Sequence, residues 1–224
     1  MHEHLLATDG FALVPEVLRT EECEAIAGYA SPSVSTSAGT RSLLQQSWCA
    51  SLAERLREHP VLSKLVPAEF VAAQCTYFEK SASRNWLVPV HQDLSIPVAA
   101  RVSNPALRGW SEKEGSLFVQ APIEFLEKLV AVRVHLDACA SQDGPLRVVP
   151  GTHGRGRIEP EVAAAIRATA MEVPCHAEKG EALAMRPLLL HASSKATGTS
   201  RRRVLHFLFG PRQLPYGLRW QHAV

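Results

Sequence analysis

The sequence predicts a mainly β protein, an antiparallel sandwich or barrel with flanking helices. Short strand-like runs separated by turn signals fill the chain from residue 70 onward, whereas the first third has the apolar spacing of helices. No internal repeat or linker divides the sequence, and 224 residues are enough for one well-buried core but few for two. We therefore expect a single domain over 1–224, with 1–69 mostly helical and the β-barrel core over 70–210.

Two start signals mark the helices of the first third. Thr20 can cap a helix with an acidic first turn, and Ser42 with Gln45 matches a capping box. Behind the capping box, one apolar stripe recurs every four residues: Leu44, Trp48, Leu52 and Leu56. Pro60 should end that helix, which we expect to pack on a sheet. An Ala-rich stretch at 160–170 predicts a surface helix.

The expected strands are short and are separated by turns such as Asp143-Gly144. They cover 70–79, 86–90, 117–119, 130–138, 146–149, 182–185, 188–193 and 204–209. Within 130–138 the residue types alternate, so that one face carries Val132, Val134 and Leu136 and the other carries Arg133, His135 and Asp137. Such alternation is typical of a strand with one face toward an apolar core.

Composition narrows the possible partners. The chain has 24 Lys and Arg against 22 Asp and Glu, which gives no electrostatic reason to expect nucleic acid or an anionic membrane as a partner. No apolar stretch approaches the ~20 residues of a membrane span, and the N-terminus lacks the layout of a signal peptide. The five cysteines form no CxxC pair, so we expect free thiols and a cytoplasmic protein.

A metal-binding pattern lies in the β region. It consists of His91-Gln92-Asp93 and of His191, a hundred residues later. On an extended segment, side chains two residues apart point to the same side, so His91 and Asp93 can act together. Two imidazoles and one carboxylate bind one face of a divalent metal and leave the other open, which is the arrangement of non-haem Fe(II) oxygenases.

A second H-x-D tripeptide, His135-Leu136-Asp137, also precedes His191 and competes for the same role. In a double-stranded β-helix, the jelly-roll or cupin-like barrel, the tripeptide ends the second strand and the distal histidine lies on the seventh. The expected strands between 93 and 191 satisfy this count, whereas a start at Asp137 leaves only two. We therefore favour His91 and Asp93, and expect His135 and Asp137 to line the barrel or form hydrogen bonds inside it.

Arg202 follows His191 by eleven residues, within a run of three arginines. Strand alternation allows Arg202 to face inward beside His206, while the partner face carries Leu205, Phe207 and Phe209. A buried arginine is costly unless it is paired. A dicarboxylate such as 2-oxoglutarate would supply that pair through a bidentate contact.

Taken together, these residues resemble the phytanoyl-CoA dioxygenase family of Fe(II)/2-oxoglutarate-dependent oxygenases. The resemblance runs over nearly the whole chain. It rests on Asp9-Gly10-Phe11, the segment NWLVPVHQD at 85–93, GPLRVVPGTH at 144–153, His191-Ala192-Ser193-Ser194 and Arg202. The tripeptide is a weak motif by itself, whereas its combination with the other segments is specific.

The resemblance implies a role for each matching residue. His91, Asp93 and His191 would be the catalytic iron ligands, and Arg202 and Ser193 would hold the distal carboxylate of 2-oxoglutarate. Gln74 resembles a glutamine that binds the cosubstrate in related hydroxylases. Halogenases of this family replace the carboxylate ligand with a small residue, so the presence of Asp93 disfavours halogenation.

The implied reaction is hydroxylation of a small molecule by O2, with release of succinate and CO2. Trp86, Arg133 and Arg147 are candidate substrate or support residues. Two alternatives remain open at this point: a non-catalytic module that binds 2-oxoglutarate or metal, and a cupin-type isomerase or hydrolase that depends on zinc or manganese. The sequence does not name the substrate, because one fold serves many functions.

Overall fold

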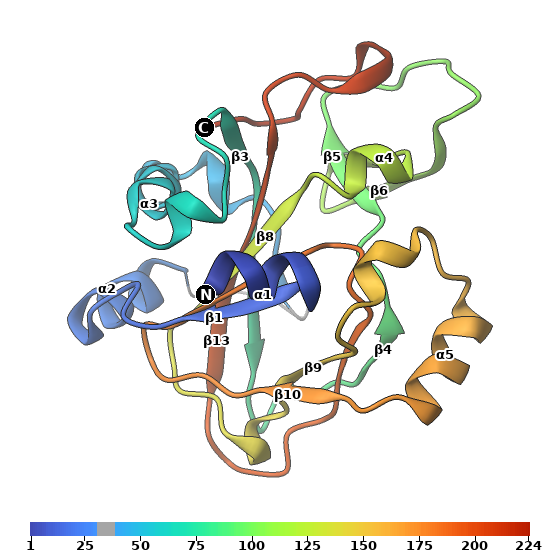
Figure 1. The fold of residues 1–224 in the computed structure, drawn as a ribbon. Helices are drawn as coiled ribbons and strands as arrows, with labels where there is room; N and C mark the ends of the chain where they lie inside the picture. Colours follow the sequence, from blue (N-terminus) through green and yellow to red (C-terminus); the bar gives the residue numbers. More distant parts are fainter. Residues whose placement is uncertain (31–38) are drawn as a thin grey trace.

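The computed structural model describes residues 1–30 and 39–224, and its strands form three antiparallel sheets (Figure 1). The major sheet has the order β1 (Phe11–Val14), β11 (Ala182–Met185), β8 (Val130–His135), β13 (Arg202–Pro211), β3 (Phe70–Lys80) and β2 (Gly39–Thr40). The minor sheet has the order β10 (Val173–Cys175), β9 (Leu146–Val148), β12 (His191–Ser193) and β4 (Val88–His91). The third sheet has the order β5 (Ser95–Val98), β7 (Ser116–Gln120) and β6 (Arg108–Lys113).

The major and minor sheets pack face to face through an apolar cluster. Leu183 and Met185 of the major sheet contact Leu146 and Val148 of the minor sheet there. Two antiparallel sheets packed in this way form the jelly-roll barrel that the sequence predicts. The third sheet extends the barrel, because Val119 of β7 joins a second cluster with apolar side chains of the major sheet.

Strand β13 shows how alternation divides the core. Leu205, Phe207 and Phe209 are fully buried on its outer face, where the helices pack. The opposite face presents Arg202 and His206 to the interior of the barrel. One strand of period two thus supplies both an apolar core face and the polar lining of a cavity.

The helices lie outside the sheets. They are α1 (His2–Thr8), α2 (Thr20–Ala30), α3 (Ser47–Glu58), α4 (Ile123–Leu126) and α5 (Pro160–Thr169). In Figure 1, α2 and α3 (blue to cyan) lie on one side of the molecule and α5 (orange) lies on the other. Ile26 of α2 and Leu52 of α3 pack on the major sheet, whereas Ala163 of α5 packs behind the minor sheet. No helix among the described residues has the length and apolar character to cross a bilayer.

The helices of the first third do not all begin where the sequence predicts. The Ser42–Gln45 segment is not a capping box: a 3-10 turn occupies Leu43–Gln45, no side chain caps it, and α3 begins only at Ser47. Thr20 is itself the first residue of α2, and the Glu22 carboxylate accepts a hydrogen bond from the Arg19 amide at that end. Helix α3 does end at Glu58, before Pro60, as expected.

The N-terminal flank also contributes to the barrel. Strand β1 pairs with β11 at the edge of the major sheet, so this flank is not only helical. The Gly151 amide donates to the Asp9 carbonyl at 2.9 Å, which joins the Asp9-Gly10-Phe11 segment to the GPLRVVPGTH segment. Two of the segments that carry the family resemblance therefore support each other structurally.

Candidate functional site

Strands β4 and β12 bring together two histidines and one aspartate. His91 ends β4, His191 begins β12, and the two residues are direct partners in the antiparallel register. One ligand atom from each of His91, Asp93 and His191 lies within 4.8 Å of the others. This is the one group of its kind among the described residues. The sequence-predicted triad is therefore assembled in space.

The backbone fixes the orientation of both imidazoles. Nδ1 of His91 lies 2.9 Å from the Pro89 carbonyl oxygen, and Nδ1 of His191 lies 2.8 Å from the Leu189 carbonyl oxygen. Because a carbonyl oxygen only accepts, each Nδ1 carries the proton and leaves a lone pair on Nε2. The two Nε2 atoms lie 3.7 and 3.6 Å from the carboxylate oxygens of Asp93, so all three donors face one point.

The ionisation states suit metal binding. Burial alone would raise the pKa of Asp93, but the imidazoles of His191, His206 and His91 hold that pKa well below its usual value. Burial lowers the pKa of His191 to about 4. Near neutral pH, Asp93 is therefore ionised and His191 is neutral, and these are the forms that coordinate a cation.

Gln92 lies between the two ligands and is 8% exposed. Its amide nitrogen donates to the carbonyls of Gly156 and Leu188 at 2.8 and 2.7 Å, and its oxygen accepts from the Ile158 amide at 2.8 Å. The Asp93 amide in turn donates to the Pro187 carbonyl at 2.8 Å. The segment that carries the ligands is thus tied to the loops before α5 and before β12.

The competing tripeptide has a different environment. Both carboxylate oxygens of Asp137 are occupied by the guanidinium of Arg203, each at 2.7 Å. His135 is buried, and its Nδ1 has no hydrogen-bond partner in the structure. Because the Asp137 carboxylate is engaged with Arg203, the structure favours His91 and Asp93, as the strand count predicts.

A cavity of about 440 Å³ contains the triad. At its buried end it is lined by Arg133, Ser193 and Arg202, which are 7%, 4% and 2% exposed. Gln74 and Trp86 also line the cavity. Gln74 donates to the Thr76 hydroxyl at 2.7 Å. At the exposed end lie Arg41 and Lys113, and Arg41 is paired with Glu114 at 2.6 Å.

The run of three arginines divides between the two faces of β13. Arg201 pairs with Glu79 at 2.9 Å, and Arg203 pairs with Asp137. Arg202 faces the cavity, where its Nη1 donates to the Gly144 carbonyl at 2.7 Å and its Nε has no partner in the structure. The structure thus determines the strand register: Arg202 is the inward residue of the three.

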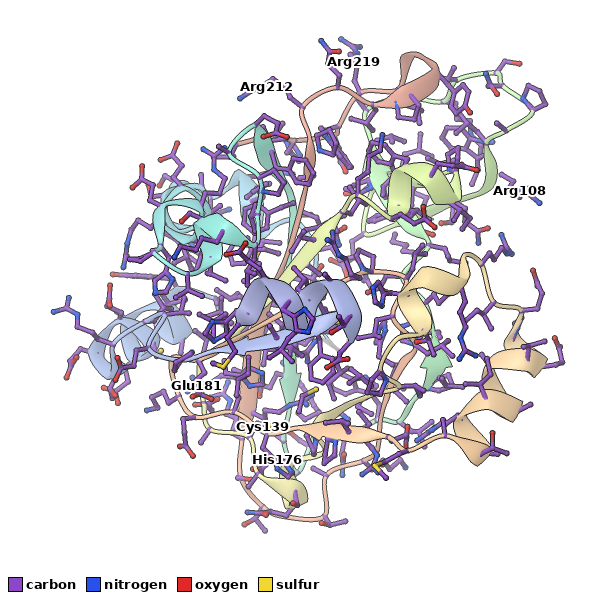
Figure 2. The ribbon with its side chains drawn as sticks, in the orientation of Figure 1. Arg108, Cys139, His176, Glu181, Arg212 and Arg219 are labelled. Atoms are coloured by element: carbon purple, nitrogen blue, oxygen red, sulfur yellow. The ribbon has the colours of Figure 1, made fainter. Side chains whose placement is uncertain are left out.

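Other arginines show how unusual this burial is. Arg108, Arg212 and Arg219 extend from the surface into solvent (Figure 2). Arg147 is also peripheral: it does not line the cavity, and its Nε donates to Glu172 at 2.9 Å. Its strand neighbour Leu146 takes the inward position, because alternate residues of β9 face opposite sides.

Several residues in or beside the cavity were not predicted. Lys80, next to Arg202 in the sheet, is the continuation of the alternation Gln74, Thr76, Phe78, but the expected strand stopped one residue short. His206 lies 3.9 Å from Asp93 and was expected only to share a face with Arg202. Arg41 and Lys113 reach the cavity from distant segments, and no local pattern indicates this.

The model of the phytanoyl-CoA dioxygenase (PhyH) family matches residues 6–204. The chain belongs to this family. Its members are non-haem oxygenases that use Fe(II), 2-oxoglutarate and O2, which confirms the predicted enzyme class. Comparison with curated protein sequences gives no match.

Solved structures share the fold of this family member at low sequence identity. SnoK, described as a non-haem alpha ketoglutarate dependent carbocyclase from nogalamycin biosynthesis, has a TM-score of 0.69 at 14% identity, over 94% of this chain and 83% of SnoK. EctD from S. alaskensis has a TM-score of 0.68 at 14% identity, over 99% of this chain and 82% of EctD. HygX from Streptomyces hygroscopicus, with nickel and 2-oxoglutarate bound, has a TM-score of 0.63 at 18% identity, over 94% and 86% of the two chains.

The residues of this chain fit both the metal and the cosubstrate of the family. Two imidazole nitrogens and one carboxylate are donors that suit Fe(II), and their ligand atoms lie within 4.8 Å of one another. The buried Nε atoms of Arg133 and Arg202 have no partner in the structure, which fits an anion at the buried end of the same cavity.

Proposed function

We propose that this enzyme hydroxylates a small molecule, with His91, Asp93 and His191 as the iron ligands. The observation that carries the proposal is the shared cavity, which is lined both by the triad and by Arg202, whose buried Nε has no hydrogen-bond partner. When bound, Fe(II) and 2-oxoglutarate activate O2 and supply the oxidant, with succinate and CO2 as by-products. The residues of the cavity bind the cosubstrate, hold the substrate and exclude water.

Arg202 anchors the cosubstrate by pairing with its distal carboxylate. The Gly144 carbonyl accepts from one Nη of the guanidinium, and the buried Nε, which has no partner, is available to take part in a bidentate contact. Ser193 donates its hydroxyl to the same carboxylate. Gln74, on the wall of the cavity, is placed to contact the cosubstrate as well.

The remaining lining holds the substrate and excludes water from it. Trp86 and Leu94 supply apolar contact area, and Arg133 contributes charge. A cavity of about 440 Å³ lies in the range of small-molecule sites, which supports a small organic substrate. The five buried thiols fit a reducing compartment, so we place the reaction in the cytoplasm.

An isomerase or hydrolase on the same barrel is less compatible with the structure. Such an enzyme would need the metal ligands but no dicarboxylate, so Arg202 would stay buried without an anionic partner. A binding module without turnover would use the same residues as the oxygenase. Only the oxygenase consumes O2 together with 2-oxoglutarate.

Succinate formation tests the proposal. Purified protein supplied with Fe(II), 2-oxoglutarate and O2 should form succinate, at a higher rate when a metabolite panel includes the substrate. Asp93→Ala and Arg202→Ala should abolish it, because one removes a ligand and the other the cosubstrate anchor. Arg201→Ala is the matched control, since Arg201 pairs with Glu79 away from the cavity.

Unchanged turnover in Asp93→Ala or in Arg202→Ala would overturn the assignment. A reaction sustained by zinc or manganese without O2 would favour the isomerase or hydrolase. A visible charge-transfer band formed anaerobically with Fe(II) and 2-oxoglutarate, and not bleached by O2 in the presence of any panel member, would favour the binding module.

A further inference from the structure

Lys80 is a buried lysine at the closed end of the cavity. It is the last residue of β3, is 1% exposed, and is the direct register partner of Arg202 on β13. Its ammonium donates to the Ser193 hydroxyl at 2.9 Å and to the Ser194 carbonyl, and it lies 5.6 Å from the centre of the Trp86 ring. Lys80 does not itself line the cavity, whereas Ser193 does.

Three cations share this end without a counter-charge. Lys80, Arg133 and Arg202 are all buried, and none of them forms an ion pair with a carboxylate of the described part of the chain. Burial, followed by the nearby Arg202 and Arg133, lowers the pKa of Lys80 to about 7. Burial and Arg202 likewise lower the pKa of Arg133 to about 9. The chain thus keeps a costly excess of positive charge beside the cavity.

The contact with Lys80 fixes the direction of the Ser193 hydroxyl. In its charged form, which a nearby carboxylate favours, the ammonium has three N–H donors and no acceptor, so the Ser193 oxygen must accept from it. The hydroxyl hydrogen is then available for another acceptor, and such an acceptor can lie in the cavity, which Ser193 lines. The second bond, to the Ser194 carbonyl, holds the ammonium at the end of β12 and so keeps it against Ser193.

The neighbouring turn is shaped to admit this arrangement. Gly144 has φ +63, and a Cβ there would lie 3.2 Å from the Lys80 ammonium and 2.5 Å from the Ser194 carbonyl oxygen. The carbonyl of the same glycine accepts from Arg202 at 2.7 Å. The Lys80 ammonium and the Arg202 guanidinium thus both lie close to Gly144, at the point where its backbone approaches that of Ser194.

We propose that Lys80 is a positioning residue for the cosubstrate: it orients the Ser193 hydroxyl toward the distal carboxylate of 2-oxoglutarate and adds a second positive charge beside Arg202. The proposal rests on the proposed function, because it assumes that this dicarboxylate binds here. Lys80 acts through Ser193 and through its charge, without touching the cosubstrate.

The test measures cosubstrate binding apart from turnover. Anaerobic protein with saturating Fe(II) is titrated with 2-oxoglutarate, and the visible charge-transfer band gives the Kd. Lys80→Met, which keeps length without charge, should raise the Kd by about tenfold or more, as expected for losing a charge-assisted contact. Lys179→Met is the matched control, because Lys179 pairs with Glu24 at the surface. Its Kd should equal that of the wild type.

Three further variants show whether Lys80 acts through Ser193 and through its charge. Ser193→Ala should also raise the Kd, and Lys80→Met should have a much smaller effect in the Ser193→Ala background than in the wild type. Lys80→Arg should restore part of the affinity. Binding of Ni(II) in the absence of 2-oxoglutarate should be unchanged in all variants, since the three metal ligands are intact.

The melting temperature of Lys80→Met distinguishes a positioning role from a purely structural role of this lysine. Because the substitution removes a buried charge that has no ion pair, the melting temperature of metal-free Lys80→Met should be no lower than that of the wild type. A Kd within twofold of the wild type in Lys80→Met would overturn the proposal. If Lys80→Met does not fold, a wild-type Kd in Ser193→Ala overturns it instead. Absence of the band in the wild-type protein would refute the proposed function itself.

Discussion

Gln92, the middle residue of the His-Gln-Asp segment, connects the proposed metal ligands to the rest of the molecule. Its amide satisfies two carbonyls and one backbone amide from two different loops. A buried amide with all of these contacts made holds the flanking His91 and Asp93 in place without contacting the metal position. The identity of this residue is therefore a matter of hydrogen-bond geometry.

Gln92→Glu should destabilise the protein strongly. A carboxylate keeps the acceptor but loses both donors, so the carbonyls of Gly156 and Leu188 face a buried negative charge. We expect a loss of about 2–4 kcal/mol in the free energy of unfolding and a fall of roughly 5–15 °C in Tm. Gln120→Glu is the control, because its side-chain oxygen accepts from Arg157 and would gain an ion pair. Equal Tm values for the two variants would contradict this account.

The candidate metal ligands could be picked out from the sequence because their spacing is local. Asp93 lies two residues from His91, and extended backbone sends both side chains the same way whatever the rest of the fold does. Lys80 could not be predicted in the same way. Its proposed role depends on Ser193 and Arg202, which reach it through the pairing of β3 with β13 and the packing of the two sheets.

The turn before β9 is the element on which the proposed cosubstrate pocket depends. It follows a 3-10 turn at Ser141–Asp143 and places Gly144 against Ser194. The sequence indicates a turn at Asp143-Gly144, but the reason for glycine lies elsewhere in the chain. Only a residue without a Cβ can adopt this φ and also leave room for the Ser194 carbonyl.

Gly144→Ala should impair both folding and cosubstrate binding. The added Cβ would meet backbone, which cannot move aside as a side chain can, and the shift would disturb the carbonyl that holds Arg202. Gly115→Ala is a matched control, because Gly115 has φ +72 but nothing lies within 4 Å of its Cβ position. The control should lose about 1 kcal/mol from backbone strain alone and keep the wild-type Kd for 2-oxoglutarate. Thermal unfolding and titration of the charge-transfer band measure both effects, and an unchanged Kd in Gly144→Ala would refute the role of the turn.

The strands were predictable where the pattern repeats and less so at their ends. Strand β3 covers the expected run with one residue more, whereas β12 begins only at His191 because Leu188 and Leu190 lie in the loop that Gln92 and Thr152 bind. Strand β1 has only four residues, too short for its alternation to stand out, and it forms by pairing with β11. Pairing between distant segments thus decides what local propensity leaves open.

At the scale of the whole molecule, the site joins the two sheets. The minor sheet and the segment after β4 supply His191, His91 and Asp93, and the major sheet supplies Arg202. The family resemblance predicts these residues, but the exposed end of the cavity is lined by Lys113 of the third sheet and by Arg41 from the segment before α3. Such packing has no signature in a single stretch of sequence.

A cosubstrate that contacts the metal and Arg202 together should therefore cross-link the two sheets and stabilise the fold. A ligand that binds only the folded state, at a hundred times its Kd, adds about 2.7 kcal/mol, or roughly 5–11 °C in Tm for a chain of this size. We expect Ni(II) alone to raise the Tm, and 2-oxoglutarate to raise it further only when the metal is present. In Arg202→Met the metal should give its full increase while the increase from 2-oxoglutarate falls sharply, because the anchor on the major sheet is gone. Asp93→Ala should lose both increases, and a chelator should return the wild-type protein to its metal-free Tm. Differential scanning calorimetry of the three proteins checks these expectations, and a full 2-oxoglutarate increase in Arg202→Met would show that the cosubstrate does not bridge the sheets.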